Sequence, residues 1–359
     1  MTDVYHRLAK KLDELPSGYP ATESGIELKI LRNIFTPEEA EMALKMRPMP
    51  ETVEAVAKRL GKSVSEMQRI LDHMVERGQI AAATISGRQM YLLLPFVVGI
   101  YELQLNRMDK EFAELFEEYL PELLKTLGGH EPALARVVPV STEIRQDLHV
   151  HRYEDVRRMI DEARSFQVTD CVCRKVRVLE GRPCNHTMQA CLFLSNEENA
   201  YPEKYLRGRV ISRGDALKLL ESSEQEGLVH CTYNIEDGHI FICNCCPCAC
   251  VGLRSVKEFN APHLLAKSNF VASIDAESCS ACGVCADERC PMDAIVEEDG
   301  AYSVLPERCI GCGVCTADCP TESIRLERKP EAEHDSPPAN IVEWNMKRAA
   351  SRGIEIKVD

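Results

Sequence analysis

The chain has 359 residues, of which 45% are hydrophobic and 28% are charged, and its formal net charge is −14 at pH 7. This balance is that of a globular protein of two to three domains, and the acidic charge argues against general binding to nucleic acid. The sequence lacks both the ~18-residue apolar run of a membrane helix and a signal-peptide core. We therefore expect a cytoplasmic protein without a membrane span.

The 18 cysteines divide the chain into two halves. None precedes Cys171, ten lie between Cys171 and Cys250, and eight lie between Cys279 and Cys319. Because thiols stay reduced in the cytoplasm, so many cysteines indicate metal binding rather than disulfides. We expect a cysteine-free front half and a metal-binding back half.

Residues 1–140 are expected to form a largely helical first domain. Apolar residues recur at helical spacing over 4–15 and 25–35, and Thr36-Pro37 followed by Glu39 is the start signal of a third helix. Two helices are predicted over 51–60 and 64–77, and a β-hairpin over 80–94. A further helix is predicted over 97–127, whose apolar side is assigned to the core, to an inter-domain contact or to a homodimer contact.

The order of helix, tight turn, helix and hairpin resembles the winged-helix family. This resemblance implies either DNA binding or protein docking. Residues 51–77 contain five acidic and five basic residues, whereas a recognition helix presents a basic face to phosphates. Only Arg88, at the hairpin turn, favours DNA binding. We therefore prefer a role in protein docking or as a scaffold for this domain.

Residues 141–270 are expected to form a cysteine-rich α+β domain. A helix is predicted over 153–166 and another after Ser212, and Glu236-Asp237-Gly238 between two apolar runs indicates a second β-hairpin. Six cysteines lie within residues 231–250, although buried thiols that serve only packing are usually dispersed. At least one metal centre is therefore predicted in this domain.

Ten cysteines are available for that centre, and the sequence leaves their assignment open. One ligand group is proposed to be Cys171, Cys173, Cys184 and Cys191. The other candidates, which would complete this group or form a separate site, are Cys243, Cys245, Cys246, Cys248 and Cys250. Cys245 and Cys248 also have the C-x-x-C spacing of a redox-active dithiol. The nearby histidines His186, His230 and His239 are assigned structural roles.

Two matching cysteine runs follow, about 30 residues apart. The first is Cys279-x-x-Cys282-x-x-Cys285 with Cys290-Pro291, and the second is Cys309-x-x-Cys312-x-x-Cys315 with Cys319-Pro320. Residues 270–327 thereby resemble the bacterial two-cluster ferredoxins, and a zinc site is the less favoured alternative. One departure is that four residues separate Cys285 from Cys290, where the family has three, so a local bulge is expected.

The ferredoxin resemblance implies two [4Fe–4S] clusters, with the cysteine of each Cys-Pro pair serving the other run's cluster. Cluster one would take Cys279, Cys282, Cys285 and Cys319, and cluster two would take Cys309, Cys312, Cys315 and Cys290. Because the chain already commits to iron–sulfur chemistry, a third [4Fe–4S] cluster is favoured over zinc in the central domain. The Cys-x-Cys-Arg and Ile-Cys-Asn-Cys-Cys stretches there are similar to stretches in iron–sulfur proteins of anaerobes.

Residues 275–322 contain eleven acidic and two basic side chains, which suits a redox partner with a basic docking face. The ferredoxin domain is placed at 271–328 and a tail at 329–359. A short helix over 341–350 is either a docking helix or part of a loosely held tail.

The sequence thus predicts an α+β multidomain protein with a winged-helix-like domain, a cysteine-rich domain and a ferredoxin-like domain. Its favoured function is that of an electron carrier, or of an electron-transfer subunit in a larger complex. The first alternative is a transcriptional regulator that senses the state of its clusters. The second is an oxidoreductase with its active site at the central cysteines.

Overall fold

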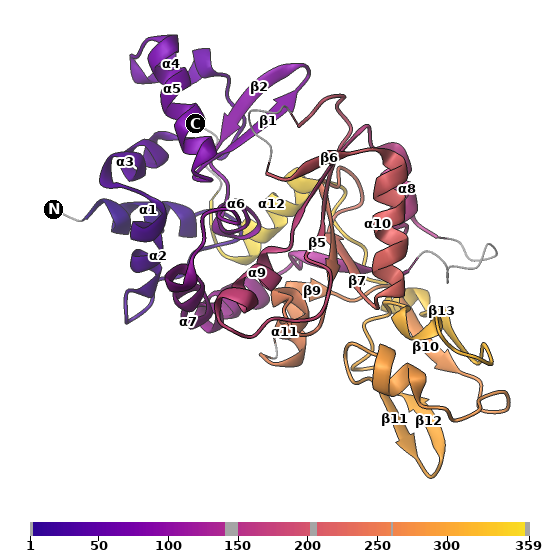
Figure 1. Cartoon of the computed structure of the whole chain (residues 1–359). Helices are drawn as coiled ribbons and strands as arrows, with labels where there is room; N and C mark the ends of the chain where they lie inside the picture. The colour runs from indigo at the N-terminus through magenta and orange to yellow at the C-terminus, as the bar shows by residue number, and fades with distance from the viewer. Residues whose placement is uncertain (1–2, 141–149, 202–206, 260, 356–359) are drawn as a thin grey trace.

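A seven-stranded sheet lies at the centre of the computed structural model, which describes residues 3–140, 150–201, 207–259 and 261–355 (Figure 1). All neighbouring strands are antiparallel except β3 and β9. In spatial order the strands are β6 (Arg209–Ile211), β4 (Ser165–Asp170), β5 (Gln189–Ser195), β8 (Phe241–Cys245), β7 (Val229–Tyr233), β3 (Ala135–Val138) and β9 (Leu265–Ala266).

The two faces of this sheet have different chemistry. One face carries aliphatic and aromatic residues, among them Phe166, Leu192 and Ile242, which pack under α8 (Val156–Glu162) and α10 (Arg213–Gln225). Side chains alternate between faces along a strand, so Cys191 and Cys243 lie on the opposite face. That face is covered by α9 (Val172–Leu179), by α11 (Val251–Lys257) and by the N-terminal half of the chain.

The N-terminal half is a helical unit with one β-hairpin. The start signal at Thr36 forms a capping box, in which the Thr36 hydroxyl accepts from the Glu39 amide and the Glu39 carboxylate accepts from the Thr36 amide. The elements of this unit are α1 (Val4–Asp13), α2 (Ile26–Ile34), α3 (Pro37–Lys45), α4 (Val53–Leu60), α5 (Val64–Glu76), β1 (Ala81–Ile85), β2 (Arg88–Leu92), α6 (Tyr101–Leu103) and α7 (Lys110–Gly128).

Most helices of the N-terminal half agree with the sequence prediction, and α4, α5 and the β1–β2 hairpin occur in the predicted order. The helix predicted over 97–127 is wrong in its first part. Residues 96–103 form a short irregular turn and α6, and the long helix begins at Lys110 after the N-cap Asp109. The apolar side of α7, including Phe112, Phe116 and Leu120, is buried in the chain's own core.

Residues Ala135–Val138 form strand β3 within the central sheet. Strand β3 pairs with β7 over four residues and in parallel with β9. The N-terminal half is also tied to α11 on the same face of the sheet, where Glu117 of α7 accepts two hydrogen bonds from Arg254 of α11 at 2.9 and 3.0 Å. The N-terminal half and the cysteine-rich part are therefore joined by the pairing of β3 with β7 and by the ion pair between α7 and α11.

The helix predicted over 153–166 is shorter than expected. A single 3-10 turn at Arg152–Glu154 precedes α8, and Ser165 and Phe166 already belong to β4. Strands β4, β5 and β6 had no counterpart in the sequence prediction, whereas the β7–β8 hairpin is confirmed. Within the described ranges, no helix combines the length and the apolar character that crossing a bilayer requires.

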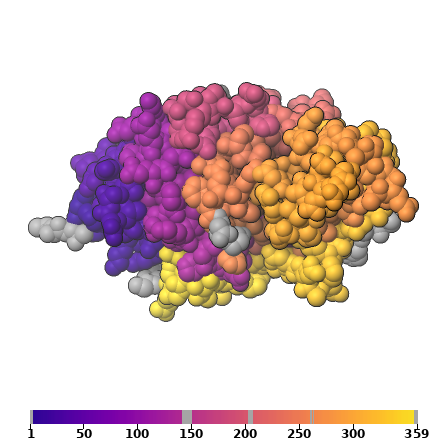
Figure 2. All heavy atoms as spheres, turned by 90° about the horizontal axis from the view of Figure 1, so that it is seen from below, coloured from indigo at the N-terminus to yellow at the C-terminus, as the bar shows by residue number. Residues whose placement is uncertain are grey.

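Residues 270–328, which we name the ferredoxin unit after the resemblance described above, form a small unit at one end of an elongated molecule. The N-terminal helices form the other end (Figure 2). The ferredoxin unit contains two antiparallel strand pairs. The first pairs β10 (Phe270–Ile274) with β13 (Ile324–Arg328), and the second pairs β11 (Ile295–Glu298) with β12 (Ala301–Val304). The unit is anchored to the rest of the chain by an ion pair between the half-buried Arg328 and the buried Glu154, at 2.7 Å.

The segment after the ferredoxin unit returns to the front half. Helix α12 (Ile341–Ser351) lies where the sequence analysis placed a short helix. Trp344 is buried, and its indole N–H donates to the Ala133 carbonyl at 2.8 Å. Arg352 donates to the Leu15 carbonyl and pairs with Asp13 at 2.9 Å. The alternative of a loosely held tail is therefore wrong for residues 341–352.

Candidate metal centres

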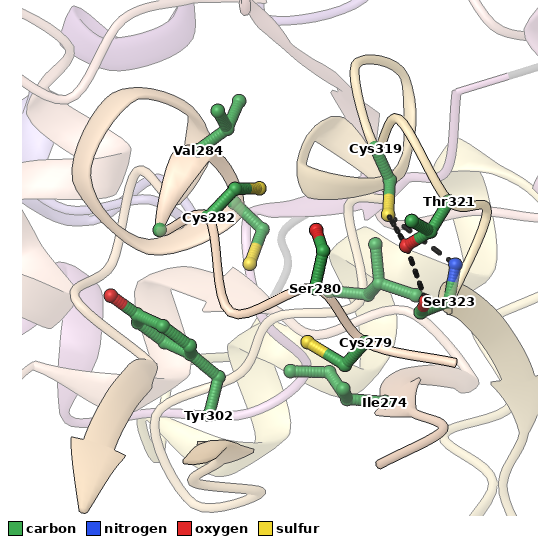
Figure 3. Close-up of a pocket in the computed structure, with 12 residues that line it drawn as sticks. Ile274, Cys279, Ser280, Cys282, Val284, Tyr302, Cys319, Thr321 and Ser323 are labelled. Carbon is green, nitrogen blue, oxygen red and sulfur yellow. Dashed lines mark hydrogen bonds between the residues drawn. The ribbon is translucent and has the colours of Figure 1, made fainter. Parts of the chain in front are cut away.

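The first group of thiols lines a cavity of about 330 Å³ in the ferredoxin unit (Figure 3). Cys279, Cys282 and Cys285 come from one run and Cys319 from the other, and together they are named the first quartet. Ile274 and Tyr302 complete the wall. Cys282 is exposed, so this cavity lies at the protein surface.

The second quartet consists of Cys290, Cys309, Cys312 and Cys315, which line a separate cavity of about 320 Å³. Cys309, Cys312 and Cys315 are all buried. Burial raises the pKa of Cys312 to about 12. A ring of buried thiols resists deprotonation unless a cation is bound, and soft thiolates are the donors that iron–sulfur clusters take. Both quartets thus fit the implied group in number and type of donor.

The two quartets repeat the same local geometry. The Cys290 sulfur accepts a hydrogen bond from the Ala294 amide at 3.2 Å, and the Cys319 sulfur accepts one from the Ser323 amide at 3.3 Å (Figure 3). Desolvation opposes ionisation of Cys319, but hydrogen bonds from the backbone amides of Ile324, Thr321 and Ser323 and from the Thr321 hydroxyl lower its pKa overall. Amide donors of this kind stabilise thiolate and tune the potential of a bound cluster.

The extra residue in the first run is accommodated by a π-helical turn at Cys285–Arg289. In the second run the corresponding turn is a tighter 3-10 turn at Val314–Thr316. A π-turn inserts one residue without breaking the helix, which is how Cys290 still reaches the second quartet. The expected bulge therefore takes this form.

Gly311 shows why the second run is packed more tightly than the first. Its φ is +66°, and a Cβ there would lie 2.1 Å from the Phe270 carbonyl oxygen. The corresponding residue of the first run is Ala281, which is exposed and has a φ of 53°. Only glycine fits at position 311, because the backbone there lies directly against Phe270 at the start of β10.

The central cysteines divide into two groups. Six thiols form a closed chain of side-chain interactions, which we name the central ring. In order around the ring they are Cys171, Cys173, Cys250, Cys245, Cys243 and Cys191. Cys231, which the sequence analysis placed in neither ligand group, contacts the ring through Cys245.

Strand register and helix ends explain how the central ring forms. Cys191 lies opposite Cys243, which in turn lies opposite Cys231, so three adjacent strands present a row of thiols on one face. Cys245 lies on the same face, two residues beyond Cys243. Cys171 and Cys250 are the N-cap residues of α9 and α11, the two helices that cover this face.

The thiols of the central ring differ in their readiness to ionise. Hydrogen bonds from Cys173 and Cys191 hold the pKa of Cys171 well below its ordinary value. The pKa of Cys173 and that of Cys191 are raised, first by the interaction with Cys171 and then by other neighbours and burial. The ring therefore favours one thiolate, at Cys171, beside two neighbours whose thiols are harder to ionise.

The remaining thiols form a second group, named the outer trio, of Cys184, Cys246 and Cys248. Their sulfur atoms lie within 4.8 Å of one another. The structure thus places the Cys184 sulfur beside those of Cys246 and Cys248, while the proposed ligand group of Cys171, Cys173, Cys184 and Cys191 stays a prediction. The structure also separates Cys245 from Cys248, whose side chains interact with different partners, so the two do not form a dithiol pair.

The nearby histidines hydrogen-bond to protein groups rather than to cysteines. His230 is fully buried between Asn244, at 2.7 Å, and Glu224, at 3.3 Å. His186 pairs with Glu226 and His239 contacts the Thr232 hydroxyl. These contacts agree with structural roles for all three.

The central ring lies at the junction of the three parts of the chain. On one side, Tyr101 and Val176 belong to the core of the N-terminal half, against which Cys173 and Cys243 pack. On the other side, Cys231 and Cys245 share a core with Cys312 and other cysteines of the second quartet. Cys231 and Cys312 are close enough for their charges to interact.

Comparison with known proteins concerns the ferredoxin unit. Searches among curated proteins and among solved structures found no match. Residues 272–320 match the family model of the 4Fe-4S dicluster domain, and both quartets fall within this stretch. The chain therefore carries an iron–sulfur domain at residues 272–320.

Proposed function

We propose that this chain is an iron–sulfur electron-transfer protein with two [4Fe–4S] clusters in the ferredoxin unit and a third metal centre at the central ring. The observation that supports this proposal is the spatial order of the three thiol groups. The first quartet is exposed at Cys282, the second quartet is largely buried, and the central ring shares a core with the second quartet. A [4Fe–4S] cluster supplies one-electron transfer when it is bound. The chain's part is to hold the ligands in this order.

The first quartet is suited to contact with a redox partner because Cys282 is exposed. Exposed carboxylates surround this end of the molecule, including Glu277, Asp287, Glu288 and Glu322. An acidic surface steers a basic partner to the cluster and raises the association rate at low salt. The proposed partner is therefore a protein with a basic docking face.

The second quartet is suited to pass electrons inward. The Val140 amide donates to the Cys312 carbonyl at 3.0 Å, directly after strand β3 of the central sheet. The shared core around Cys231, Cys245 and Cys312 excludes water between the two thiol groups. We propose that Cys231 lies on the shortest protein path between them, and that the central ring holds a third [4Fe–4S] cluster.

The N-terminal half serves this function as a cover for the central ring. Its alternative role in DNA binding is not supported by its contacts. Arg77 and Lys62, two of the five basic residues in 51–77, are paired with Glu39 and Glu66. The hairpin turn is also engaged, since the Ser86 amide donates to Glu197 at 3.1 Å. A homodimer through this half stays a prediction.

Iron and sulfide analysis with EPR spectroscopy of the anaerobically purified, reduced protein tests the proposal. About twelve irons and matching sulfide per chain are expected, and about eight would remove the third cluster. Cys282→Ser should change the signal of the exposed cluster, and Cys312→Ser that of the buried one. Cys243→Ser should reduce iron to about eight while both ferredoxin signals remain.

Two results would overturn the proposal. Zinc without sulfide in the purified protein would remove the electron-transfer function. A gel shift with genomic DNA fragments that depends on the presence of iron would favour the regulator instead.

A further inference from the structure

The outer trio adjoins the central ring, since Cys173 packs against the same small core as Cys184 and Cys246. Among the described cysteines, however, only the sulfurs of the trio gather this closely. Cys184 and Cys246 are 3.9 Å apart at sulfur, and all three sulfurs lie within 4.8 Å of one another. Thiolates that bind one tetrahedral Zn²⁺ at about 2.3 Å lie about 3.8 Å apart. Ligands of a four-iron cluster bind different iron atoms and must lie further apart. The spacing of the trio therefore suits a single ion.

We propose that Cys184, Cys246 and Cys248 bind one Zn²⁺ ion, separately from the iron–sulfur clusters. Soft thiolates in tetrahedral geometry select zinc among common divalent ions outside iron–sulfur clusters. The site is distinct from the centres of the proposed function and does not depend on them.

Arg174 positions the trio and balances its charge. The buried guanidinium donates to the Cys246 sulfur at 3.4 Å, to the Asn244 carbonyl at 3.0 Å and to the Thr187 carbonyl. These bonds join the loop that carries Cys184 to the turn that carries Cys246. Three thiolates and one Zn²⁺ have a net charge of −1, which the guanidinium neutralises in this buried setting.

A second contact fixes the same loop from its other side. The Glu226 carboxylate accepts from the Thr187 amide at 2.6 Å and contacts His186 at 3.2 Å. The loop is thus held by Arg174 and Glu226 before any metal binds. Because the loop is already held in place, Cys184 loses little conformational entropy when an ion binds, and this favours tight binding of the ion.

The fourth coordination position is open. Among the residues that the structure describes, the group contains no fourth cysteine, histidine or carboxylate. Cys248 is exposed, so solvent reaches the trio at this residue. Three protein ligands with a water at the fourth position is the arrangement of zinc sites that bind an exchangeable ligand. The site therefore takes water or a donor atom of a small molecule as its fourth ligand.

Metal analysis of the purified full chain tests the site independently of electron transfer. The wild type should contain one zinc per chain in addition to cluster iron. Cys248→Ser and the Cys184→Ser/Cys248→Ser double variant should lose zinc and keep iron and sulfide. Cys319→Ser is the reciprocal control, which should lose iron and keep zinc. Cys248→His should retain the ion, since imidazole is also a zinc ligand.

Cobalt substitution gives a second readout. Co²⁺ added to zinc-depleted protein should produce thiolate-to-cobalt charge-transfer bands, which shift in Cys248→His and vanish in the double variant. Arg174→Gln should weaken Co²⁺ binding about 10- to 100-fold. Absence of both zinc and cobalt bands in the wild type would overturn the proposal. So would a Cys184–Cys246 disulfide, or loss of cluster iron together with zinc in Cys248→Ser.

Discussion

At the scale of single residues, buried arginines complete the backbone hydrogen bonding of this fold. Arg348 is fully buried and donates to the carbonyls of Thr126 and Leu127 in the last turn of α7, at 3.3 and 2.6 Å. These carbonyls have no partner within the helix, and a cation at a helix C-terminus is also favoured by the dipole. Burial lowers the pKa of Arg348 to about 10, which leaves it charged at neutral pH.

Replacing Arg348 should therefore destabilise the front half. Arg348→Ala leaves buried carbonyls unpaired, and we expect the free energy of unfolding to fall by about 3 kcal/mol. Urea unfolding measures the change. Arg325→Ala, which removes an exposed ion pair with Glu327, is the control and should change stability by less than about 0.5 kcal/mol. Equal effects of the two substitutions would contradict this role.

Glu102 gives the protein a pH-dependent stability. Burial raises the pKa of this carboxyl to about 7 from its ordinary 4.5, although hydrogen bonds from the Gly99 amide oppose the shift. The folded state therefore holds a proton that the unfolded state releases. This contribution is fully present below about pH 4.5 and is lost as the pH rises through 7.

The difference between wild type and Glu102→Gln isolates that contribution. Relative to the variant, the wild type should lose about 2 kcal/mol of unfolding free energy between about pH 5 and about pH 8. Urea midpoints of both proteins at the two pH values give the comparison. A difference that does not depend on pH would show that Glu102 titrates normally.

At the scale of elements, the π-turn at Cys285–Arg289 does more than lengthen the first cysteine run. It ends on Arg289, which donates to the carbonyls of Glu224 and Gln225 at 3.0 Å each and pairs with Asp318 at 3.2 Å. Those carbonyls end helix α10, which lies on the opposite face of the sheet from the central ring. The turn thereby fastens the ferredoxin unit to the sheet layer.

Arg289→Ala should loosen this attachment without removing a cluster ligand. We expect faster hydrogen exchange in the last turn of α10 and across residues 285–319, because the helix-end carbonyls lose their donor. Mass spectrometry of peptides from the iron-loaded protein measures this. Arg308→Ala removes an exposed cation from the same unit and should leave exchange unchanged. Unchanged exchange in both variants would rule out an anchoring role.

Local sequence signals predicted the elements that depend on near neighbours. The capping box at Thr36, the β7–β8 hairpin and the cysteine runs of the ferredoxin unit are all short-range patterns. The grouping of the central thiols depends instead on strand register, which places Cys191 beside Cys243 although 51 intervening residues separate them. Strand β5 was not recognised, so neither that register nor the inclusion of Cys231 could be predicted.

At the scale of the whole molecule, three parts of the chain meet around the central cysteines, and ion pairs fix their arrangement. Glu154 is 1% exposed and accepts from Arg328 and from Asn269, at 2.7 and 2.9 Å. Desolvation opposes ionisation of Glu154, but the hydrogen bonds from Arg328, His151 and Asn269 lower its pKa overall. Its stabilising effect is therefore present above about pH 4.5 and lost as the pH falls.

Removing one partner of this pair should be more harmful than removing both. Glu154→Ala removes the carboxylate to which Arg328 and Asn269 donate, and we expect a loss of about 3 kcal/mol in unfolding free energy. The Glu154→Leu/Arg328→Leu double variant should lose less, since it replaces both charges with apolar side chains. Urea unfolding followed by visible cluster absorbance reports on the ferredoxin unit. A larger loss in the double variant would contradict the assignment.

The return of α12 to the N-terminal helices sets an order of events during synthesis. Residues 341–352 leave the ribosome after all 18 cysteines of the chain. Until then Arg348 and Arg352 cannot reach their carbonyl partners in the front half. Metal can therefore reach the thiols before α12 has packed against the N-terminal half. Helix α12 then adds its contacts with the N-terminal helices afterwards.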